Sequence, residues 1–314
     1  MLSLGTKLTL MTALVLGACS RSEDSQLRAV FGTSDITLAK PISGQPSSAA
    51  GSIQAVLADP NGGPRFALPF CSGFLVSRRH MMTASHCVQR DFIFNQSYVA
   101  NQDGQISYVR FGKTLRLNYI GGVDPQSQQN ELSAPVFKDP VFIDRDLDVA
   151  VFDLGDQSSA RDWVNLESVS DSMATGELYA YPNGAPLTKV TCRTGRLVDG
   201  SRFMHDCDAM TGSSGGLIVS LPELTPVAMH LAGPGANDAD YYDAHREFES
   251  PEVFAERRGC SKSPADKTGL DADCQLKMGY NRGVALTAVA DALKKQNPDL
   301  WQSIRVLAQA QKPQ

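Results

Sequence analysis

Short apolar runs separated by turn residues dominate the chain between residues 52 and 232, and they restrict its fold more than any other feature. Gly and Pro punctuate the gaps between the runs, and Val, Ile, Phe and Tyr recur within them. The clearest runs are residues 52–59, 71–77, 107–112, 149–154, 177–182, 217–221 and 226–232. Runs of this length, spacing and punctuation are typical of an all-β barrel or sandwich.

Length and charge narrow the class further. The chain has 314 residues, of which 42% are hydrophobic, and a formal net charge of −5. This length is enough for one large domain or two modest ones. Lys and Arg form no basic run or stripe, so the sequence predicts no nucleic-acid partner.

The N-terminus has the features of an export signal. Lys7 precedes the apolar run 8–16, which is too short to span a bilayer and fits the central region of a signal peptide. The run ends in Leu-Gly-Ala-Cys, which resembles the processing site of bacterial lipoproteins. We therefore expect residues 1–18 to be a signal peptide and Cys19 to be lipidated. The alternative is an ordinary signal peptide that ends near a cysteine by chance.

The remaining cysteines point to disulfides. The chain has seven cysteines, and setting Cys19 aside leaves six, an even number in an exported protein. Six cysteines allow 15 connectivities, so the sequence alone does not fix the pairing. Nearest-neighbour pairing is the simplest arrangement. The six are Cys71, Cys87, Cys192, Cys207, Cys260 and Cys274.

Two regions differ from the strand-rich middle. Residues 286–296 have apolar residues at helical spacing, and Asn297-Pro298 ends this helix and can begin another turn. Residues 250–274 are polar and irregular, which predicts a long surface loop, clipped by a Cys260–Cys274 bridge if those neighbours pair.

Three segments carry residues that suit nucleophilic catalysis. They are residues 71–87, 146–154 and 207–219, and they supply His86, Asp148 and Ser214 in that order. A neutral imidazole can take the proton of a serine hydroxyl, and a carboxylate can fix the tautomer of that imidazole. Gly212 lies before the serine, and two further glycines, at 215 and 216, follow it. Such small residues allow backbone N–H groups to converge on an oxyanion.

Together these segments resemble the chymotrypsin-like, or trypsin-like, serine peptidases, and most of all the bacterial branch that includes the glutamyl endopeptidases. "TASHC" stands where the family has Thr-Ala-Ala-His-Cys, "DVAV" matches Asp-(Ile/Val)-Ala-Leu, and "GSSGG" matches Gly-Xaa-Ser-Gly-Gly. The resemblance runs from about residue 50 to about residue 296. It implies a catalytic triad of His86, Asp148 and Ser214, with the amides of Gly212 and Ser214 as the oxyanion hole. It also implies that Cys87 bonds to Cys71 and braces the turn that presents the histidine.

Each assignment has a competitor in the sequence. Cys71, His80, His86 and Cys87 could in principle bind zinc, although the export signal and the lack of a Cys-x-x-Cys pair argue against this. Asp146 is the alternative to Asp148, and Ser213 is the alternative to Ser214. We expect His80 and His245 to be solvated surface residues.

Substrate specificity stays open at this stage. Asp208 lies six residues before Ser214, where trypsin-like members carry the carboxylate that favours Arg or Lys. His230 resembles the pocket histidine of glutamyl endopeptidases, which favours Glu or Asp. Either residue could instead have a structural role, Asp208 bonded to local backbone and His230 within the core. Gly283, in the segment 283–287, is expected on the third wall of the pocket.

The resemblance further implies an all-β fold of two packed six-stranded antiparallel β-barrels with a C-terminal α-helix. We expect a tether or pro-segment at 19–50, barrels at 51–155 and 156–285, and a helical segment at 286–314. Digestive members of the family order the oxyanion hole with a new N-terminal ammonium paired to an aspartate before the nucleophile. Ser213 holds that position here, so we expect local bonds to order this loop instead.

The sequence therefore predicts a serine endopeptidase that acts through an acyl-enzyme intermediate. The alternative is a catalytically inactive binding lipoprotein of the same fold. No metal or organic cofactor is implied. The expected partners are peptide or protein substrates. The expected protein is a monomer that contacts a membrane only through its lipid, facing the periplasm or cell surface, or is secreted.

Overall fold

A computed structural model describes the part of the chain that carries the predicted strands. The described residues are 35–57, 66–88, 98–100, 106–108, 114–121, 132–136, 139–155, 162–170, 175–182, 185–198, 200–233 and 281–309. The signal peptide, Cys19, His245, the predicted loop 250–274 and the cysteines at 260 and 274 lie outside these residues.

The first sheet has seven strands in the spatial order β8, β7, β2, β3, β4, β10 and β9, and all neighbours are antiparallel. Among the described residues, no pairing joins β8 to β9. A separate pair consists of β5 (Tyr98–Ala100) and β6 (Ile106–Tyr108). The seven strands are β2 (Ala50–Leu57), β3 (Phe66–Leu75), β4 (His80–Ala84), β7 (Thr114–Gly121), β8 (Leu132–Val136), β9 (Phe142–Asp144) and β10 (Val149–Asp153).

The second sheet also has seven antiparallel strands, in the order β1, β12, β11, β14, β15, β16 and β13. Because β13 pairs with both β16 and β12, six of these strands follow one another in a ring, and β1 extends the sheet from β12. The strands are β1 (Thr37–Leu38), β11 (Thr175–Ala180), β12 (Thr188–Val198), β13 (Arg202–His205), β14 (Leu217–Ser220), β15 (Thr225–Ala232) and β16 (Asn281–Ala285).

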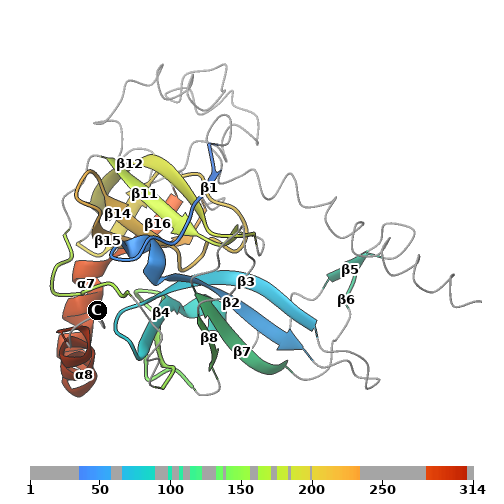
Figure 1. Ribbon diagram of the computed structural model, residues 1–314, viewed down its shortest axis with the longest axis horizontal. Helices are drawn as coiled ribbons and strands as arrows, with labels where there is room; N and C mark the ends of the chain where they lie inside the picture. The colour runs from blue at the N-terminus through green and yellow to red at the C-terminus, as the bar shows by residue number, and fades with distance from the viewer. Residues whose placement is uncertain are drawn as a thin grey trace, which may run out of the picture.

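The two sheets lie one above the other, and the helices cover one side. Figure 1 shows the yellow strands of the second sheet above the blue-to-green strands of the first. One buried cluster joins them, since it contains Phe74 and Val149 from the first sheet and Leu217 and Met229 from the second. The fold is thus mostly β with two antiparallel sheets, in agreement with the predicted chymotrypsin-like class.

The C-terminal helices follow the prediction closely. Helix α7 (Leu286–Gln296) buries Leu286, Val289 and Leu293 at helical spacing, so one face packs on the core. Pro298 begins helix α8 (Pro298–Gln309) at the first helical position, where its missing N–H costs nothing. The side chain of Asn297 caps this helix by accepting the amide hydrogen of Leu300 at 3.1 Å. No helix among the described residues is both long and apolar enough to cross a membrane.

Residues 35–50, which the sequence assigns to a tether or pro-segment, lie on the folded body. Thr37 and Leu38 form β1 and pair with β12, and a short 3-10 helix η2 (Pro46–Ala49) leads into β2. Ala49 is fully buried. The sequence does not signal this docking because the partner strand lies about 150 residues away along the chain.

The predicted strands coincide with observed ones wherever the residues are described, except that the run 107–112 is described only in β6. One expectation is wrong. His80 is 3% exposed rather than solvated, because it opens β4, a strand whose five residues are all buried. Its Nδ1 lies 2.9 Å from the hydroxyl of Ser77, and burial, the largest cause, lowers its pKa.

Candidate active site

His86 is presented by a short braced turn at the edge of the first sheet. It lies in the 3-10 helix η3 (Ser85–Val88), directly after the buried strand β4. A disulfide joins Cys71 on β3 to Cys87, with a Cα–Cα distance of 6.2 Å. The bridge therefore ties the turn to the neighbouring strand and limits where the imidazole can lie.

Asp148 enters the site from a turn that ends at β10. Its backbone has a positive φ of 54°, a region that a non-glycine residue adopts at some energetic cost. Asp144 holds the start of this turn, because its Oδ1 accepts the amide hydrogens of Asp146 and Leu147, each at 3.0 Å. Directly after the turn, Val149 pairs with Ala84, which sets Asp148 beside η3.

The structure brings His86 and Asp148 into direct contact. Nδ1 of His86 lies 2.6 Å from Oδ2 of Asp148, and the His86 amide donates to Oδ1 at 2.9 Å. The hydroxyl of Ser85, which the sequence did not single out, donates to the same Oδ1 at 2.7 Å. Asp146 is exposed, and the contact with the imidazole is made by Asp148.

These contacts keep the carboxylate charged. Burial opposes the charge on Asp148 and by itself would raise its pKa. The hydrogen bond and charge of His86, aided by the Ser85 hydroxyl, outweigh burial and lower the pKa below its ordinary value. A charged carboxylate on Nδ1 favours the tautomer that leaves Nε2 able to accept a proton.

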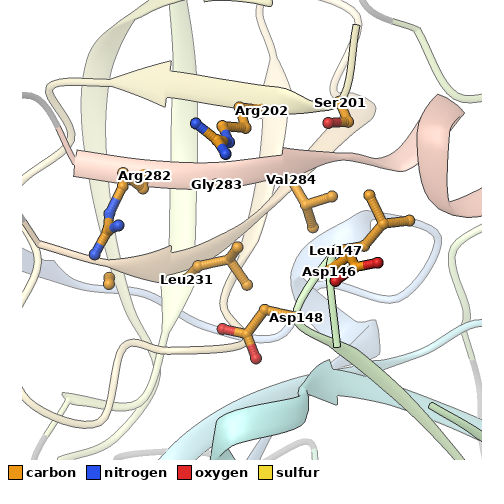
Figure 2. A pocket seen from close by; sticks show the side chains of 10 residues that line it. Asp146, Leu147, Asp148, Ser201, Arg202, Leu231, Arg282, Gly283 and Val284 are labelled. Carbon is orange, nitrogen blue, oxygen red and sulfur yellow. The ribbon is translucent and has the colours of Figure 1, made fainter. Parts of the chain in front are cut away.

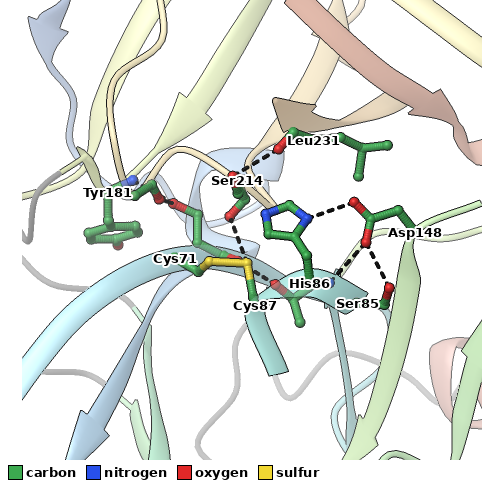
Figure 3. The surroundings of a disulfide bond; sticks show 11 residues. Cys71, Ser85, His86, Cys87, Asp148, Tyr181, Ser214 and Leu231 are labelled. Carbon is green, nitrogen blue, oxygen red and sulfur yellow. Dashed lines mark hydrogen bonds and ion pairs between the residues drawn. A yellow bond between two sulfur atoms is a disulfide. The ribbon is translucent and has the colours of Figure 1, made fainter. Parts of the chain in front are cut away.

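Ser214 reaches the same place from the second sheet. It lies in a tight loop before β14, where Gly212 and Gly215 have φ of 94° and 85°. A Cβ on Gly215 would lie 2.0 Å from the carbonyl oxygen of Ser72, so only glycine fits there. Figure 3 shows the imidazole of His86 between the Asp148 carboxylate and Ser214. The Ser214 hydroxyl itself donates to the carbonyl of Leu231 at 2.8 Å.

The neighbouring serine is committed to the loop. Ser213 is buried, and its hydroxyl oxygen accepts the amide hydrogen of Met210 at 3.2 Å. Its own amide donates to the carbonyl of Met210 at 2.9 Å. Within the described chain, the amides of Gly212 and Ser214 donate to no protein acceptor, which leaves both available to a ligand.

The three residues expected in a substrate pocket lie in different environments. Asp208 is 4% exposed, and its Oδ2 accepts the amide hydrogen of Asp35 at 3.2 Å, so a backbone bond from far along the chain engages it. His230 on β15 is buried and its Nδ1 lies 3.0 Å from Nε2 of His205 on β13. Gly283 on β16 pairs with His230, and a Cβ there would lie 2.7 Å from the carbonyl of Met229.

The buried histidine pair is kept neutral. Burial, followed by the charges of His86 and Arg282, lowers the pKa of His230 to about 3. Burial also lowers the pKa of His205 well below its ordinary value, with the charge of His230 as the second cause. The sequence did not indicate His205, because its contact with His230 spans 25 residues and two strands that are not neighbours in the chain.

A cavity of about 250 Å³ lies beside Asp148, which forms part of its lining. Figure 2 shows Asp148 at its lower edge and the strand β16, with Gly283 and Val284, behind it. Arg282 and Leu231 form its other side, so the cavity has both apolar and charged walls. Its size suits side chains of an extended peptide.

The zinc alternative loses its ligands in this geometry. Ligand atoms of Cys71, His86 and Cys87 lie within 4.8 Å of one another. However, the two sulfurs are bonded to each other, so neither is a thiolate that could bind a metal ion. The second bridge joins Cys192 to Cys207, so nearest-neighbour pairing is confirmed for both pairs among the described residues.

Comparison with known proteins assigns the family. Residues 71–229, just over half of the chain, match the family model of the trypsin-like peptidase domain. The chain belongs to the trypsin-like peptidases. It is therefore a serine-type peptidase, a hydrolase that acts on peptides or proteins. A comparison with curated protein sequences finds no match.

Several solved structures are similar to this trypsin-like peptidase. A Glu endopeptidase in complex with MPD has 15% identity and a TM-score of 0.49, with 90% of this chain and 100% of that chain covered. The serine endoprotease from Yersinia pestis has 11% identity and a TM-score of 0.45, covering 81% and 65%. The VesB protease of Vibrio cholerae has 14% identity and a TM-score of 0.46, covering 83% and 66%.

The disulfides also bear on where this trypsin-like peptidase folds. Two bridges lie within the described residues. Stable structural disulfides form in oxidising compartments and are rare in the cytosol. The bridges thus indicate an extracellular or periplasmic protein.

Proposed function

We propose that the chain is an endopeptidase that hydrolyses peptide bonds through a triad of His86, Asp148 and Ser214. The observation that carries the proposal is the imidazole of His86, bonded at 2.6 Å to Asp148 on one side and facing Ser214 on the other. His86 and Asp148 adjoin strands of the first sheet and Ser214 adjoins a strand of the second. His86 and Ser214 lie 128 residues apart in the chain.

In the first step the Ser214 hydroxyl turns from the Leu231 carbonyl to Nε2 of His86 and gives up its proton there. The oxygen attacks the substrate carbonyl, and the amides of Gly212 and Ser214 stabilise the resulting oxyanion. His86 then passes the proton to the leaving amine, which yields an acyl-enzyme ester. Water, deprotonated by His86, attacks the ester carbonyl. His86 then returns the proton to the Ser214 oxygen as the acyl–oxygen bond breaks, which releases the acid product and restores the free serine.

Asp148 does not take the proton in this scheme. Its lowered pKa keeps it ionised, so it stabilises the imidazolium that forms in each half-reaction. The bonds from Ser85 and from the His86 amide hold the carboxylate in place while the charge on the ring changes.

For the residue before the cleaved bond, we propose a preference for acidic over basic side chains. Asp208 is engaged by the amide of Asp35, whereas His230 lies near the positive charge of Arg282. Gly283, which pairs with His230 on the neighbouring strand, would form the adjoining wall of the pocket. A peptide-library profile tests the preference, and cleavage after Arg or Lys would assign Asp208 to the pocket instead.

We also propose that Cys19 carries a lipid that anchors the protein to a bacterial membrane. A lipid with several acyl chains anchors a protein stably, whereas a single acyl chain gives only marginal membrane binding. Mass spectrometry of the mature N-terminal peptide tests the modification, and an unmodified N-terminus in a secreted protein would contradict it.

A fluorophosphonate probe tests the catalytic proposal directly. Such a probe forms a stable bond only with an activated serine, so we expect one label per chain, mapped to Ser214 by peptide mass spectrometry. The inactive-lipoprotein alternative predicts no labelling. Labelling at Ser213 would show that the nucleophile is the neighbouring serine.

A further inference from the structure

The side chain of Ser72 makes two bonds that the mechanism above does not use. Ser72 lies on β3 in the first sheet and is 1% exposed. Its hydroxyl donates to the carbonyl oxygen of Gly212 at 2.8 Å and accepts the amide hydrogen of Tyr181 at 2.9 Å. The hydroxyl is therefore a donor on one side and an acceptor on the other, and its one hydrogen is already used in the bond to Gly212.

The bond to Gly212 acts on the peptide unit that follows this glycine. The Gly212 carbonyl and the Ser213 amide belong to the same planar unit. Ser72 holds the carbonyl, and the Met210 carbonyl holds the amide at 2.9 Å. Both ends of the unit are thus fixed, so the loop cannot rotate there without breaking two buried hydrogen bonds.

Ser72 also holds the other side of the loop. Its amide donates to the carbonyl of Ser214 at 2.7 Å. The loop from 212 to 214 is therefore bonded at its first and last residues to one residue of the opposite sheet. The carbonyl of Ser72 in turn accepts from the hydroxyl of Thr83 at 2.7 Å, which fixes Ser72 itself.

From these contacts we infer that Ser72 is a positioning residue that keeps the oxyanion hole open. Ser213 has no charge and cannot hold this loop by an ion pair. The buried hydroxyl of Ser72, from the first sheet, can hold it by hydrogen bonds. The amides of Gly212 and Ser214 belong to the two peptide units that flank the fixed Gly212–Ser213 unit, so fixing that unit limits how far either amide can turn. This inference rests on the proposed function, since it assigns how the oxyanion hole of that mechanism is held.

Ser72→Ala removes the hydroxyl and leaves the backbone bond to Ser214 intact. The Gly212 carbonyl and the Tyr181 amide then lose a buried partner, which favours rotation of the loop. We expect kcat to fall about 10- to 100-fold, less than the loss of an oxyanion donor itself, with KM changed less than twofold. Affinity for a peptide aldehyde, which forms a tetrahedral oxyanion, should fall in parallel, whereas affinity for the cleaved product peptide should not.

Ser52 provides a matched control. It lies directly opposite Ser72 in the sheet, is 4% exposed, and its hydroxyl has no hydrogen-bond partner within the described residues. Ser52→Ala should keep kcat and aldehyde affinity within twofold of the wild type. Ser72→Thr, which retains a hydroxyl, should recover part of the activity that Ser72→Ala loses.

Each variant is assayed below its measured unfolding temperature, with the folded fraction counted by exhaustive fluorophosphonate labelling. If Ser72→Ala does not fold, Ser72→Gly takes its place with the same expectation. Equal kcat in Ser72→Ala and Ser52→Ala would overturn the inference, as would equal losses of aldehyde and product affinity. Failure of the wild type to label would instead overturn the proposed function, so the two failures are distinguishable.

Discussion

The hydroxyl of Ser85 donates a hydrogen bond of 2.7 Å to Oδ1 of Asp148. The amide of His86 donates to the same oxygen, and the imidazole contacts the other. The carboxylate is thus satisfied on both oxygens although it is partly buried. Ser85 therefore adds a side-chain hydrogen bond to a carboxylate that already bonds to the amide and the imidazole of His86.

Ser85→Ala should destabilise the protein in a pH-dependent way. The pKa of Asp148 is below its ordinary value of 3.8, so its contacts stabilise the fold above that pH, and the stabilisation is lost as pH falls through the lowered pKa. Removing one bond to the charged form should cost about 1 kcal/mol at pH 7 and less in acid. Urea unfolding from pH 7 downward measures this difference.

Ser220→Ala is the control for that experiment. Its hydroxyl donates to the neutral carbonyl of Thr225, away from the triad, so its effect on unfolding should not change with pH. A Ser85→Ala loss that stays constant across the same pH range would mean that the bond to Asp148 does not favour its charged form.

Ser214→Ala should remove almost all turnover while the chain stays folded. Knockouts of a triad nucleophile lower kcat by about 10⁶-fold, because the remaining groups have nothing to activate. Ser213→Ala should lose far less, since that hydroxyl only accepts the amide of Met210. Turnover per mole of folded protein, with concentration from absorbance and folding from circular dichroism, measures both variants. Near-normal activity in Ser214→Ala would move the nucleophile to Ser213.

The acid limb of kcat/KM should report a single proton. Hydrolysis needs the neutral form of His86, so kcat/KM falls as pH decreases and the imidazole takes up a proton. The pKa of His230 is about 3 and that of His205 is also lowered, so neither contributes between pH 8 and 5. Log kcat/KM against pH should therefore fall with a slope near one. A flat profile would exclude His86 as the base, and a slope near two would require a second group.

The two disulfides allow a paired test of how His86 is held. They close loops of similar length, with sequence separations of 16 and 15, so each should stabilise the fold by about 3 kcal/mol. Only the first bridge touches the turn that carries His86. Replacing both Cys71 and Cys87 with Ala should lower kcat at a temperature where the protein is folded.

Replacing both Cys192 and Cys207 with Ala should cost similar stability and leave kcat within about threefold, because that bridge joins β12 to the segment after β13 and does not touch the turn that carries His86. Thermal unfolding and titrated turnover of the two double variants give the comparison. Equal kcat in both would mean that the first bridge does not position the base.

The sequence predicted the elements that have a local pattern, which include the strands near 149–154 and 217–221 and the helix 286–296. The family resemblance predicted the contact of His86 with Asp148, which joins two motifs. Contacts between distant residues that no motif marks were missed. By contrast, Ser72 meets Gly212 across 140 residues and β1 meets β12 across about 150, and no local pattern encodes such a contact. The expectation for His80 was wrong because this residue begins β4, a strand whose five residues are all buried.

The last prediction concerns activation of the protein. A buried N-terminal ammonium would need a negative charge at position 213 to pair with, because an unpaired buried charge is very costly. Ser213 instead exchanges hydrogen bonds with Met210, and Ser72 holds the carbonyl of Gly212, so the loop is ordered without an ammonium. The backbone amide of Asp35 donates a hydrogen bond to the carboxylate of Asp208, and this bond needs no free N-terminus. A chain that begins at residue 19 with Cys19→Ser, shown by mass spectrometry to be intact, should therefore hydrolyse a suitable peptide without processing. A chain that stays inert until it is cut between residues 20 and 52, and is active afterwards, would show that this segment is an inhibitory pro-region.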